Sequence, residues 1–397
     1  MYKIHPDFPT RKPVTGAQLK EICDKPVLKR GLFTNPVIIE SFEMVHNNNL
    51  FMLVVRTNDG SKGIGVPSAR ANYLMPMLEQ LILPYFIGKD ARDLDALIDG
   101  AYLYGGNYKL AGLALFCCIA WVEGAILDLL GKIANKSVGQ LLGDIQRTEL
   151  DIYVASGNRG TTPEEEVDIL QRRLDETGAK ACKFKLGGRM SRNADSIAGR
   201  TEGLLLTARK RLGDDMILHT DGNGSYDAEF GIKIGRLCEE INAYFYEEPC
   251  PFDDLWDTQA VAQALTVPIA FGEQETSLRR FQWIIENDAA TVIQPDLQYT
   301  GGFIRCTRVA RMAEAAGKVV TPHVSGGVSS VPMLHFIGFT PNAGRYHEYK
   351  NFNDCYDLFE PHMVPKNGKL HIPQGAGLGM NISERMLNRG YKMFTLK

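Results

Sequence analysis

The feature that most constrains the fold is a regular alternation, after Leu150, of short apolar runs and longer amphipathic stretches. The apolar runs occupy residues 151–155, 181–186, 216–220, 243–246, 268–271, 291–293, 318–321 and 344–347. Helix-like segments between them include residues 163–177, 193–212, 229–241, 278–287 and 303–316. Strand–helix alternation is typical of a parallel sheet, and eight repeats predict a closed β/α barrel over residues 146–358.

The first 145 residues have a different pattern and predict a separate α+β domain. Strands are expected at residues 36–46, 50–57 and 63–67, with a tight turn at Asn47–Asn49. Apolar residues then recur at helical spacing from Leu74 to Leu142. Residues 1–34 form an extension before the first strand. A last segment, residues 359–397, contains no further repeat and is expected to pack back on the first domain.

Composition excludes several classes of function. The net charge of −3 provides no basic surface for nucleic acid and no polybasic patch for a membrane. The longest mostly apolar run, residues 113–130, contains Glu123 and Asp128, so a buried helix is expected there rather than a membrane span. No apolar segment suggests a signal peptide at the N-terminus. The eight cysteines include no C-x-x-C pair, which favours reduced core thiols in a cytoplasmic protein over a zinc site.

Three carboxylates are candidates for a metal site. Asp221, Glu247 and Glu273 follow three consecutive strands of the predicted barrel and are evenly spaced, one strand–helix unit apart. Since the carboxyl ends of barrel strands meet at one rim, the three side chains are expected to converge. Converging carboxylates repel one another, and a divalent cation that prefers hard oxygen ligands, such as Mg²⁺, removes that repulsion. Each one alone is equally compatible with a solvated acid in a loop.

Two lysines lie on one strand of the barrel. Lys183 and Lys185 form a K-x-K pair, so both side chains point to one face, about 7 Å apart. Near each other and a metal cation, both are expected to have lowered pKa values, which suits a base. A solvent-facing pair on an edge strand is the alternative, but a closed barrel has no edge.

A histidine and two acids complete the set of polar residues at the strand ends. Asp296 precedes His323 by one strand–helix unit, so its carboxylate is expected to hold the imidazole and raise its basicity. Glu348 follows the eighth run. His219, two residues before Asp221, is expected in a lower layer of the barrel as a structural residue.

Together these residues resemble the enolase superfamily, and most closely its mandelate racemase subgroup. The resemblance covers nearly the whole chain. It includes the segments WVEGAILDLLGK, KFK at Lys183, DGN at Asp221, EEP at Glu247, GEQ at Glu273, QPD at Asp296 with the following glycine pair, and PH at His323. It implies a (β/α)₇β barrel under an α+β capping domain that the N-terminal part and the C-terminal tail build together.

The resemblance also implies residue roles. Asp221, Glu247 and Glu273 would bind Mg²⁺, Lys185 would be a base on one face of the substrate, and the His323–Asp296 pair would act on the other face. Lys183 and Glu348 would contact the developing enediolate, and Asn223 would bind substrate.

The chain departs from the family where a specificity loop usually separates the first two cap strands, because Asn47–Asn49 leaves little room for one. The N-terminal extension, or the segment 102–109 with Tyr104 as a substrate contact, is expected to close the site instead.

The implied activity is removal of the proton next to a carboxylate, followed by loss of the neighbouring hydroxyl, in an aldonic or aldaric acid. A racemase or epimerase of a 2-hydroxy acid uses the same groups and stays open. A muconate-type cycloisomerase would have a lysine in place of the His–Asp pair, and a barrel that binds metal without catalysis would not need the full set. A small carboxylate is the expected partner, with neither nucleic acid nor membrane, in a homo-oligomer.

Overall fold

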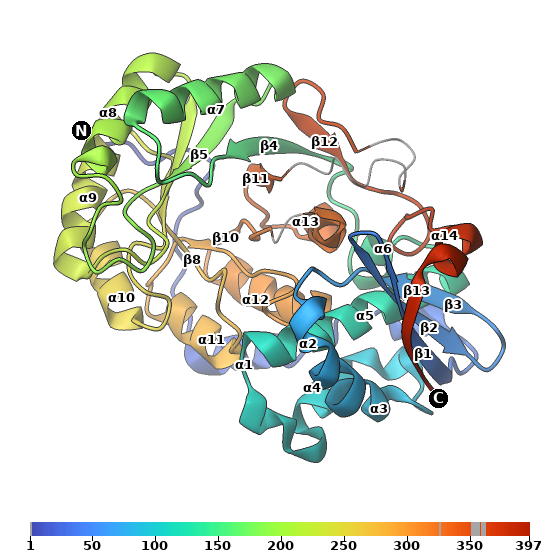
Figure 1. The fold of residues 1–397 in the computed structure, drawn as a ribbon. Helices are drawn as coiled ribbons and strands as arrows, with labels where there is room; N and C mark the ends of the chain where they lie inside the picture. The colour runs from blue at the N-terminus through green and yellow to red at the C-terminus, as the bar shows by residue number, and fades with distance from the viewer. Residues whose placement is uncertain (1, 325–326, 351–357, 359–362) are drawn as a thin grey trace.

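The structure, a computed structural model, describes residues 2–324, 327–350, 358 and 363–397 (Figure 1). Its larger part is a ring of eight parallel strands: β4 (Glu149–Ala155), β5 (Ala181–Lys185), β6 (Ile217–Asp221), β7 (Phe245–Glu247), β8 (Ile269–Phe271), β9 (Val292–Ile293), β10 (Val319–Val320) and β11 (Tyr346–Tyr349). The strands pair in the order β10-β9-β8-β7-β6-β5-β4-β11. A parallel bridge between Val320 and Ala343 joins β10 to the segment before β11. The predicted barrel is therefore confirmed.

Seven helices cover the outside of the ring: α7 (Pro163–Thr177), α8 (Arg200–Leu212), α9 (Ala228–Glu240), α10 (Leu255–Ala264), α11 (Leu278–Glu286), α12 (Phe303–Ala315) and α13 (Val331–Phe339). Local sequence explains their bounds. In α7, Thr162 and Glu165 form a capping box and Pro163 occupies the first position, where no N–H is needed. The same helix ends at Gly178, whose φ of 71° is left-handed.

The cap contains a four-stranded antiparallel sheet in the order β13-β1-β2-β3. Its strands are β1 (Ile39–Asn47), β2 (Leu50–Thr57), β3 (Lys62–Gly65) and β13 (Tyr391–Leu396). Its helices are α2 (Ala71–Met77), α3 (Leu83–Phe86), α4 (Leu94–Leu103), α5 (Leu113–Ala134) and α6 (Val138–Leu142), with short turns η1 (Arg30–Leu32), η2 (Leu78–Ile82), η3 (Ala91–Asp93) and η4 (Tyr104–Leu110). In the barrel, η5 (Gly327–Ser330) precedes α13.

The C-terminal tail returns to the cap, as predicted. After β12 (Lys369–His371), which pairs antiparallel with β4, the chain forms α14 (Glu384–Arg389) and then β13. Strand β13 pairs antiparallel with β1, so residues from both ends of the chain share one sheet. The predicted start of this segment, residue 359, lies outside the described residues.

Helix α5 is long and apolar enough to cross a membrane, but 89% of its most apolar window is buried inside the protein. Its two carboxylates, Glu123 and Asp128, accept hydrogen bonds from backbone N–H groups of other elements. Glu123 accepts hydrogen bonds from the N–H groups of Phe303 and Ile304 at the start of α12, and burial raises the pKa of Glu123 to about 8. Asp128 accepts from Ile64 of β3 (2.7 Å) and Leu378 of the tail (2.8 Å).

This close approach explains a glycine of the GG pair before α12. A Cβ on Gly302 would lie 1.9 Å from a carboxylate oxygen of Glu123, and its φ of 101° favours glycine as well. The glycine therefore lets the cap helix reach the N-terminus of α12.

The seven cysteines of the described part of the chain are free thiols, and six of them are buried. Burial raises the pKa of Cys182 to about 12. These thiols therefore pack as small apolar residues.

The N-terminal extension does not close the predicted site, so this expectation is wrong. The hydroxyl of Tyr2 donates to the carbonyl of Ala243 (2.9 Å), and the ring of Phe8 lies 4.7 Å from that of Tyr244. Both partners come just before β7, at the amino end of the barrel, whereas Glu247 is the last residue of β7. Helix α1 (Gly16–Cys23) then packs on α11 and α12. The segment packs at the amino end because its aromatic rings meet an aromatic layer there.

That layer includes His219, which is stacked on Phe245 with ring centroids 4.2 Å apart and meets Tyr153 edge-on at 4.5 Å. Burial, with Lys183 nearby, holds the pKa of His219 well below 6.5. His219 is therefore a neutral packing residue, in agreement with its predicted structural role.

Replacing Phe8 by Ala should lower the free energy of unfolding by about 1–2 kcal/mol, because a partly buried ring is lost. Urea unfolding measures this change. Ile4→Ala, at an exposed position of the same segment, is the matched control and should change stability by less than about 0.5 kcal/mol. The KM for whichever substrate the protein turns over should stay within about twofold. A several-fold rise in KM for Phe8→Ala would contradict this placement.

Buried His335 should make the protein sensitive to acid. Its Nε2 lies 3.1 Å from the carbonyl oxygen of Leu378, and burial lowers its pKa to about 4. Below pH 6.5 the unfolded chain binds a proton at this residue that the folded protein does not bind, so the free energy of unfolding falls by up to about 1.4 kcal/mol per pH unit until the folded pKa is reached.

Replacing His335 by Gln removes this titration and retains an N–H donor. Urea unfolding at pH 7, 6 and 5 gives the free energy of unfolding at each pH. Its decline with falling pH should therefore be less steep in the variant, by the contribution of about one bound proton. His371→Gln, at an exposed histidine, is the control and should keep the wild-type slope. An unchanged slope in His335→Gln would rule out this origin.

Candidate active site

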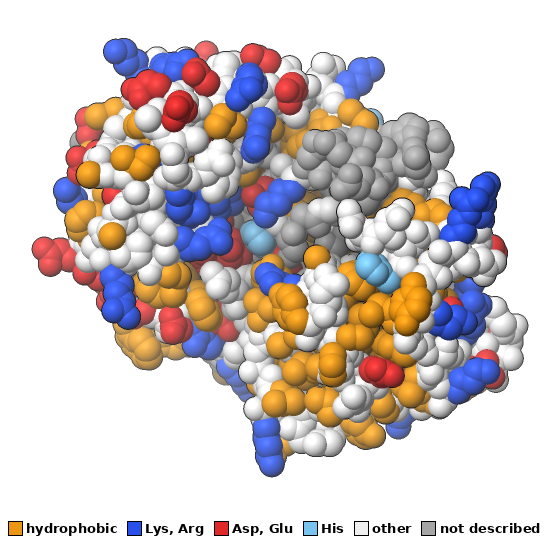
Figure 2. Space-filling model, viewed as in Figure 1, with side chains coloured by type: hydrophobic (Ala, Val, Ile, Leu, Met, Phe, Trp, Pro, Cys, Tyr) orange, Lys and Arg blue, Asp and Glu red, His pale blue; other side chains and the backbone are white. Residues whose placement is uncertain are grey.

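The predicted metal ligands converge at the carboxyl end of the barrel. Asp221 and Glu247 are the last residues of β6 and β7 and stand beside each other in register, and Glu273 follows β8. Carboxylate oxygens of the three residues lie within 4.8 Å of one another. The side chains of Asp221 and Glu247 are fully buried, and Glu273 is 9% exposed. Figure 2 shows Lys and Arg side chains gathered round a histidine in a hollow of this face.

The two lysines of β5 lie against these acids. Lys183 Nζ is 2.9 Å from both carboxylate oxygens of Glu247, and Lys185 donates to Asp221. Although burial opposes it, Glu247 and Glu348 raise the pKa of Lys183 well above 10.5. The predicted lowering is therefore wrong for Lys183 in the protein alone, because the surrounding carboxylates outweigh the effect of burial.

The pKa of one acid at this site is lowered, whereas the pKa values of two others are raised. Burial alone would raise the pKa of Asp221, but Lys185 and Lys183 lower it below its ordinary range. Burial, with Asp221 and Glu273 nearby, raises the pKa of Glu247 to about 8, although Lys183 opposes the shift. Burial and the same acids raise the pKa of Glu248 as well. The lysines thus compensate only part of the negative charge.

The donor set fits a divalent cation. Three carboxylates share one centre, and Glu273 Oε2 is a buried oxygen without a hydrogen-bond partner among the described residues. Hard oxygen ligands in small number leave coordination positions for water and substrate, which suits Mg²⁺.

His323 and Asp296 form the predicted pair. His323 Nδ1 lies 2.7 Å from Asp296 Oδ2, and a parallel bridge joins the two residues. Asp296 also accepts from the backbone N–H groups of Gln298 and Tyr299, which fix its carboxylate. Burial opposes protonation, but Glu273 and Asp296 raise the pKa of His323 above its ordinary value. The other ring nitrogen, Nε2, lies 3.6 Å from Glu273 Oε2 and so borders the candidate metal ligands.

Glu348, on β11, is buried, and its Oε2 lies 3.8 Å from Lys183 Nζ. Burial would raise the pKa of Glu348, but Lys183 and Lys350 lower it to about 2. Glu348 is thus an ionised carboxylate beside Lys183, where the family resemblance puts it.

Strand order fixes the arrangement of these groups. Lys185 comes from β5, two of the three acids end β6 and β7 and the third follows β8, and the His–Asp pair follows β9 and β10. A group that binds to the three acids therefore has a lysine on one side and a histidine on the other. This is the geometry that two-sided proton transfer requires.

Asn223 lies at the border of the site. Its N–H donates to Asp221 Oδ1 (2.8 Å), and its side-chain oxygen accepts from Arg159 (2.6 Å). The structure does not bring Tyr104 to these residues. Its ring is 45% exposed and packs on Tyr85, with centroids 5.2 Å apart. Substrate contact by Tyr104 therefore has no support, because η4 turns its ring onto the cap.

Several basic residues of the site were missed in the sequence. Lys350 Nζ lies 3.4 Å from His323 Nε2, Arg189 lies 3.5 Å from the oxygen of Asn223, and Arg159 lies closer still. They follow strands β11, β5 and β4 in the loops at the carboxyl end, which is the one signal that could have indicated them. Gln294, buried after β9, donates to Glu247 (3.1 Å).

Comparisons with known proteins agree with this geometry. Residues 165–386 match the family model "Enolase C-terminal domain-like", and residues 27–143 match the N-terminal domain of the mandelate racemase / muconate lactonizing enzyme family. The arabinonate dehydratase of Saccharolobus solfataricus is 28% identical, over 85% of this chain and 90% of its own length. The L-talarate/galactarate dehydratase of Salmonella typhimurium is 27% identical, over 83% of this chain and 80% of its own length.

Solved structures show the same fold. A protein of Roseobacter denitrificans, provisionally named a racemase, is 32% identical and superposes with a TM-score of 0.83 over 91% of this chain and 100% of its own. A mandelate racemase/muconate lactonizing protein of Paracoccus denitrificans, complexed with magnesium, is 22% identical with a TM-score of 0.81, over 90% of this chain and 99% of its own.

The family models together span both domains, and the strand ends carry the carboxylates, lysines and His–Asp pair in the expected order. The chain therefore belongs to the enolase superfamily, with the mandelate racemase type of cap and barrel.

Proposed function

We propose that the protein is a Mg²⁺-dependent dehydratase of sugar acids. It would remove the proton next to the carboxylate and expel the hydroxyl of the neighbouring carbon as water, which leaves a 2-keto-3-deoxy acid. The observation that carries the proposal is the position of Lys185 and His323 on either side of the three converging acids. The dehydratase names of relatives over most of the chain support the same reaction class.

Asp221, Glu247 and Glu273 would hold the Mg²⁺. When bound, the cation stabilises the negative charge that develops on the substrate carboxylate. Lys183 would also stabilise this negative charge, since its ammonium is buried and kept protonated by Glu247 and Glu348. In a site closed from water this stabilisation is stronger than in solution.

The two sides of the site would have different tasks. Lys185, whose amine lies against Asp221 at the end of β5, would take the proton from the carbon next to the carboxylate. His323, whose protonated form Glu273 and Asp296 favour, would give its proton to the departing hydroxyl. The electron pair of the broken C–H bond forms the double bond, the C–O pair leaves with water, and the resulting enol rearranges to the 2-keto acid.

A racemase is the second candidate. His323 on the far side of the same carbon could return a proton there instead, without loss of hydroxyl. The Roseobacter denitrificans structure, provisionally named a racemase, favours this reading. The two reactions share the proton removal and differ in which bond forms next.

Incubation with Mg²⁺ and a panel of aldonic and aldaric acids should yield a 2-keto acid, which semicarbazide detects. Lys185→Met and His323→Asn should each lower the rate by about 10²–10⁴-fold, because each removes a proton-transfer group. In D₂O, His323→Asn should keep exchange of the α-proton, while Lys185→Met should lose it. Lys233→Met, an exposed lysine paired with Glu202 on the outer helices, is the control and should retain full activity.

The outcomes separate the candidates. Exchange of the α-proton without any keto acid would contradict dehydration and favour the racemase. Neither exchange nor keto acid from any acid would contradict both and leave a binding protein on the same fold.

Glu273→Gln should weaken Mg²⁺ binding by at least about 10-fold, because the ion loses one of three charged ligands. Calorimetric titration with Mg²⁺ measures the affinity directly. Thermal unfolding gives a second measurement, since a ligand that binds the folded state raises Tm. Glu202→Gln, an exposed acid of α8, is the control and should bind like the wild type. Unchanged affinity in Glu273→Gln would refute this metal site.

A further inference from the structure

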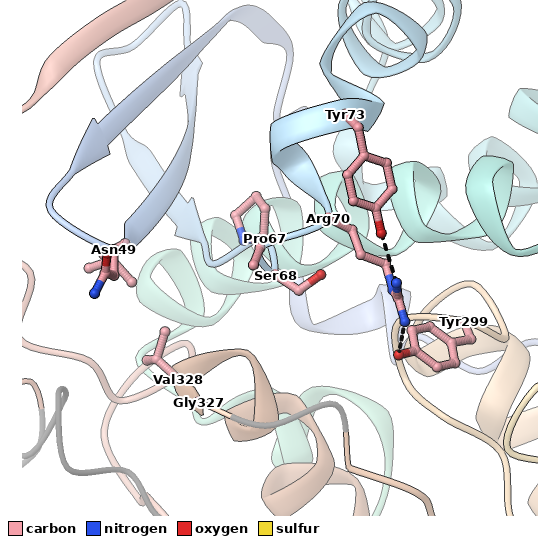
Figure 3. Close-up of a pocket in the computed structure, with 10 residues that line it drawn as sticks. Asn49, Pro67, Ser68, Arg70, Tyr73, Tyr299, Gly327 and Val328 are labelled. Carbon is pink, nitrogen blue, oxygen red and sulfur yellow. Dashed lines mark hydrogen bonds between the residues drawn. The ribbon is translucent and has the colours of Figure 1, made fainter. Parts of the chain in front are cut away.

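A cavity of about 520 Å³ lies between the cap and the barrel, beside the candidate active site. The cap contributes Pro67, Ser68, Arg70 and Tyr73, and the barrel contributes Tyr299 and Val328 (Figure 3). No described aspartate or glutamate lines it. Its one charged lining residue is thus a cation.

That cation, Arg70, is held in place by two phenols. Its Nη1 donates to the hydroxyl of Tyr73 (2.8 Å) and its Nη2 to the hydroxyl of Tyr299 (2.5 Å) (Figure 3). Burial disfavours the charge, but the two tyrosines raise the pKa of Arg70 above its ordinary value. Within the described part of the chain no carboxylate pairs with this partly buried guanidinium. The arginine is therefore fixed and charged, with donor capacity left over.

Tyr299 connects the cavity to the chemistry. Its ring centroid lies 6.0 Å from that of His323, and the guanidinium carbon of Arg70 lies 4.8 Å from the same Tyr299 ring. These two distances place the His323 ring and the Arg70 guanidinium at most about 11 Å apart, so with a hydrogen bond of about 3 Å at each end a chain of four or five carbons is long enough to reach both. A substrate that reacts at His323 would extend into the cavity.

We propose that the substrate is a dicarboxylic sugar acid whose second carboxylate binds Arg70 in this cavity. The inference rests on the proposed function, because the first carboxylate is taken to bind the Mg²⁺ that the three acids would hold. A planar guanidinium with parallel N–H donors matches a carboxylate in shape and charge. The terminal hydroxymethyl group of an aldonate would leave the cation without a counter-ion.

The sequence relatives do not decide between monocarboxylic and dicarboxylic substrates, because their names include dehydratases of both kinds of sugar acid. The position of Arg70 favours a dicarboxylic one. It also favours a carboxylate over a phosphate. Arg70 is the one cation among the described lining residues, which matches the single negative charge of a carboxylate better than the two of a dianionic phosphate.

The test compares matched substrates that differ only at the far end of the chain, such as galactarate with galactonate and glucarate with gluconate. Wild-type protein should show at least about 10-fold higher kcat/KM for the diacid of the preferred pair. Arg70→Met should lower kcat/KM for the diacid by about 10- to 100-fold, mainly through KM, and change the monoacid by less than about threefold. Arg70→Lys should recover part of the loss, since it keeps the charge.

Arg30→Met is the matched control, because Arg30 is an exposed cap arginine paired with Asp93, and it should leave both substrates unaffected. Thermal unfolding of each variant identifies a loss of fold. Equilibrium binding of the same substrate pairs to Lys185→Met, with and without Arg70→Met, measures the preference without turnover.

Three results would overturn the inference: a wild-type preference for the monoacid, an equal loss on both substrates in Arg70→Met, or a preference for the 6-phosphorylated monoacid. An equal loss would mean that Arg70 only fastens the cap to the barrel. Turnover of monoacids alone would refute the diacid inference and leave the proposed dehydration intact. Failure to turn over any acid, together with Arg70-dependent binding of the diacid, would refute the dehydration and support the inference.

Discussion

The structure depends on a balance of buried charge at the carboxyl end of the barrel. Two lysines of β5 face three acids on β6, β7 and β11, almost without solvent, and Glu273 after β8 lies beside two of these acids. A single buried charge would cost several kcal/mol, so no member of the set is tolerable without the others. The lysines hold Asp221 and Glu348 ionised, while Glu247 keeps a raised pKa. The lysines compensate only part of the carboxylate charge, so the cluster keeps a net negative charge that suits it to a cation.

The cap is held over this site by polar bonds as well as by apolar packing. Glu123 binds the first N–H groups of α12, the indole of Trp121 donates to Gln298 (3.0 Å), and Arg308 of α12 pairs with Asp99 of the cap (2.6 Å). All three contacts join the cap to the same barrel helix and the loop before it. That loop also contains Asp296 and Tyr299, so the position of the cap and the position of the His–Asp pair are set together.

The sequence was informative where spacing carries the information. Eight apolar runs predicted the barrel, and equal intervals predicted that Asp221, Glu247 and Glu273 meet, because each strand end in a closed ring has one possible position. Loops follow no such rule. Arg159, Arg189 and Lys350 lie in loops, and Tyr104 was misplaced because a short helical turn decides which way its ring faces. The N-terminal extension was misplaced for another reason. A segment before the first strand can pack at either end of a barrel, and here the aromatic layer around Tyr244 favours the amino end.

The pairing of β13 with β1 has a consequence for biosynthesis. The cap sheet takes its edge strand from residues 391–396, and Asp128 in the cap helix binds the backbone of Leu378. On the ribosome the cap sheet would thus remain incomplete until residues 391–396 emerge, while the barrel between β3 and β13 could already be forming. Until then the edge of β1 would stay unpaired, and chaperones would have to shield it during elongation.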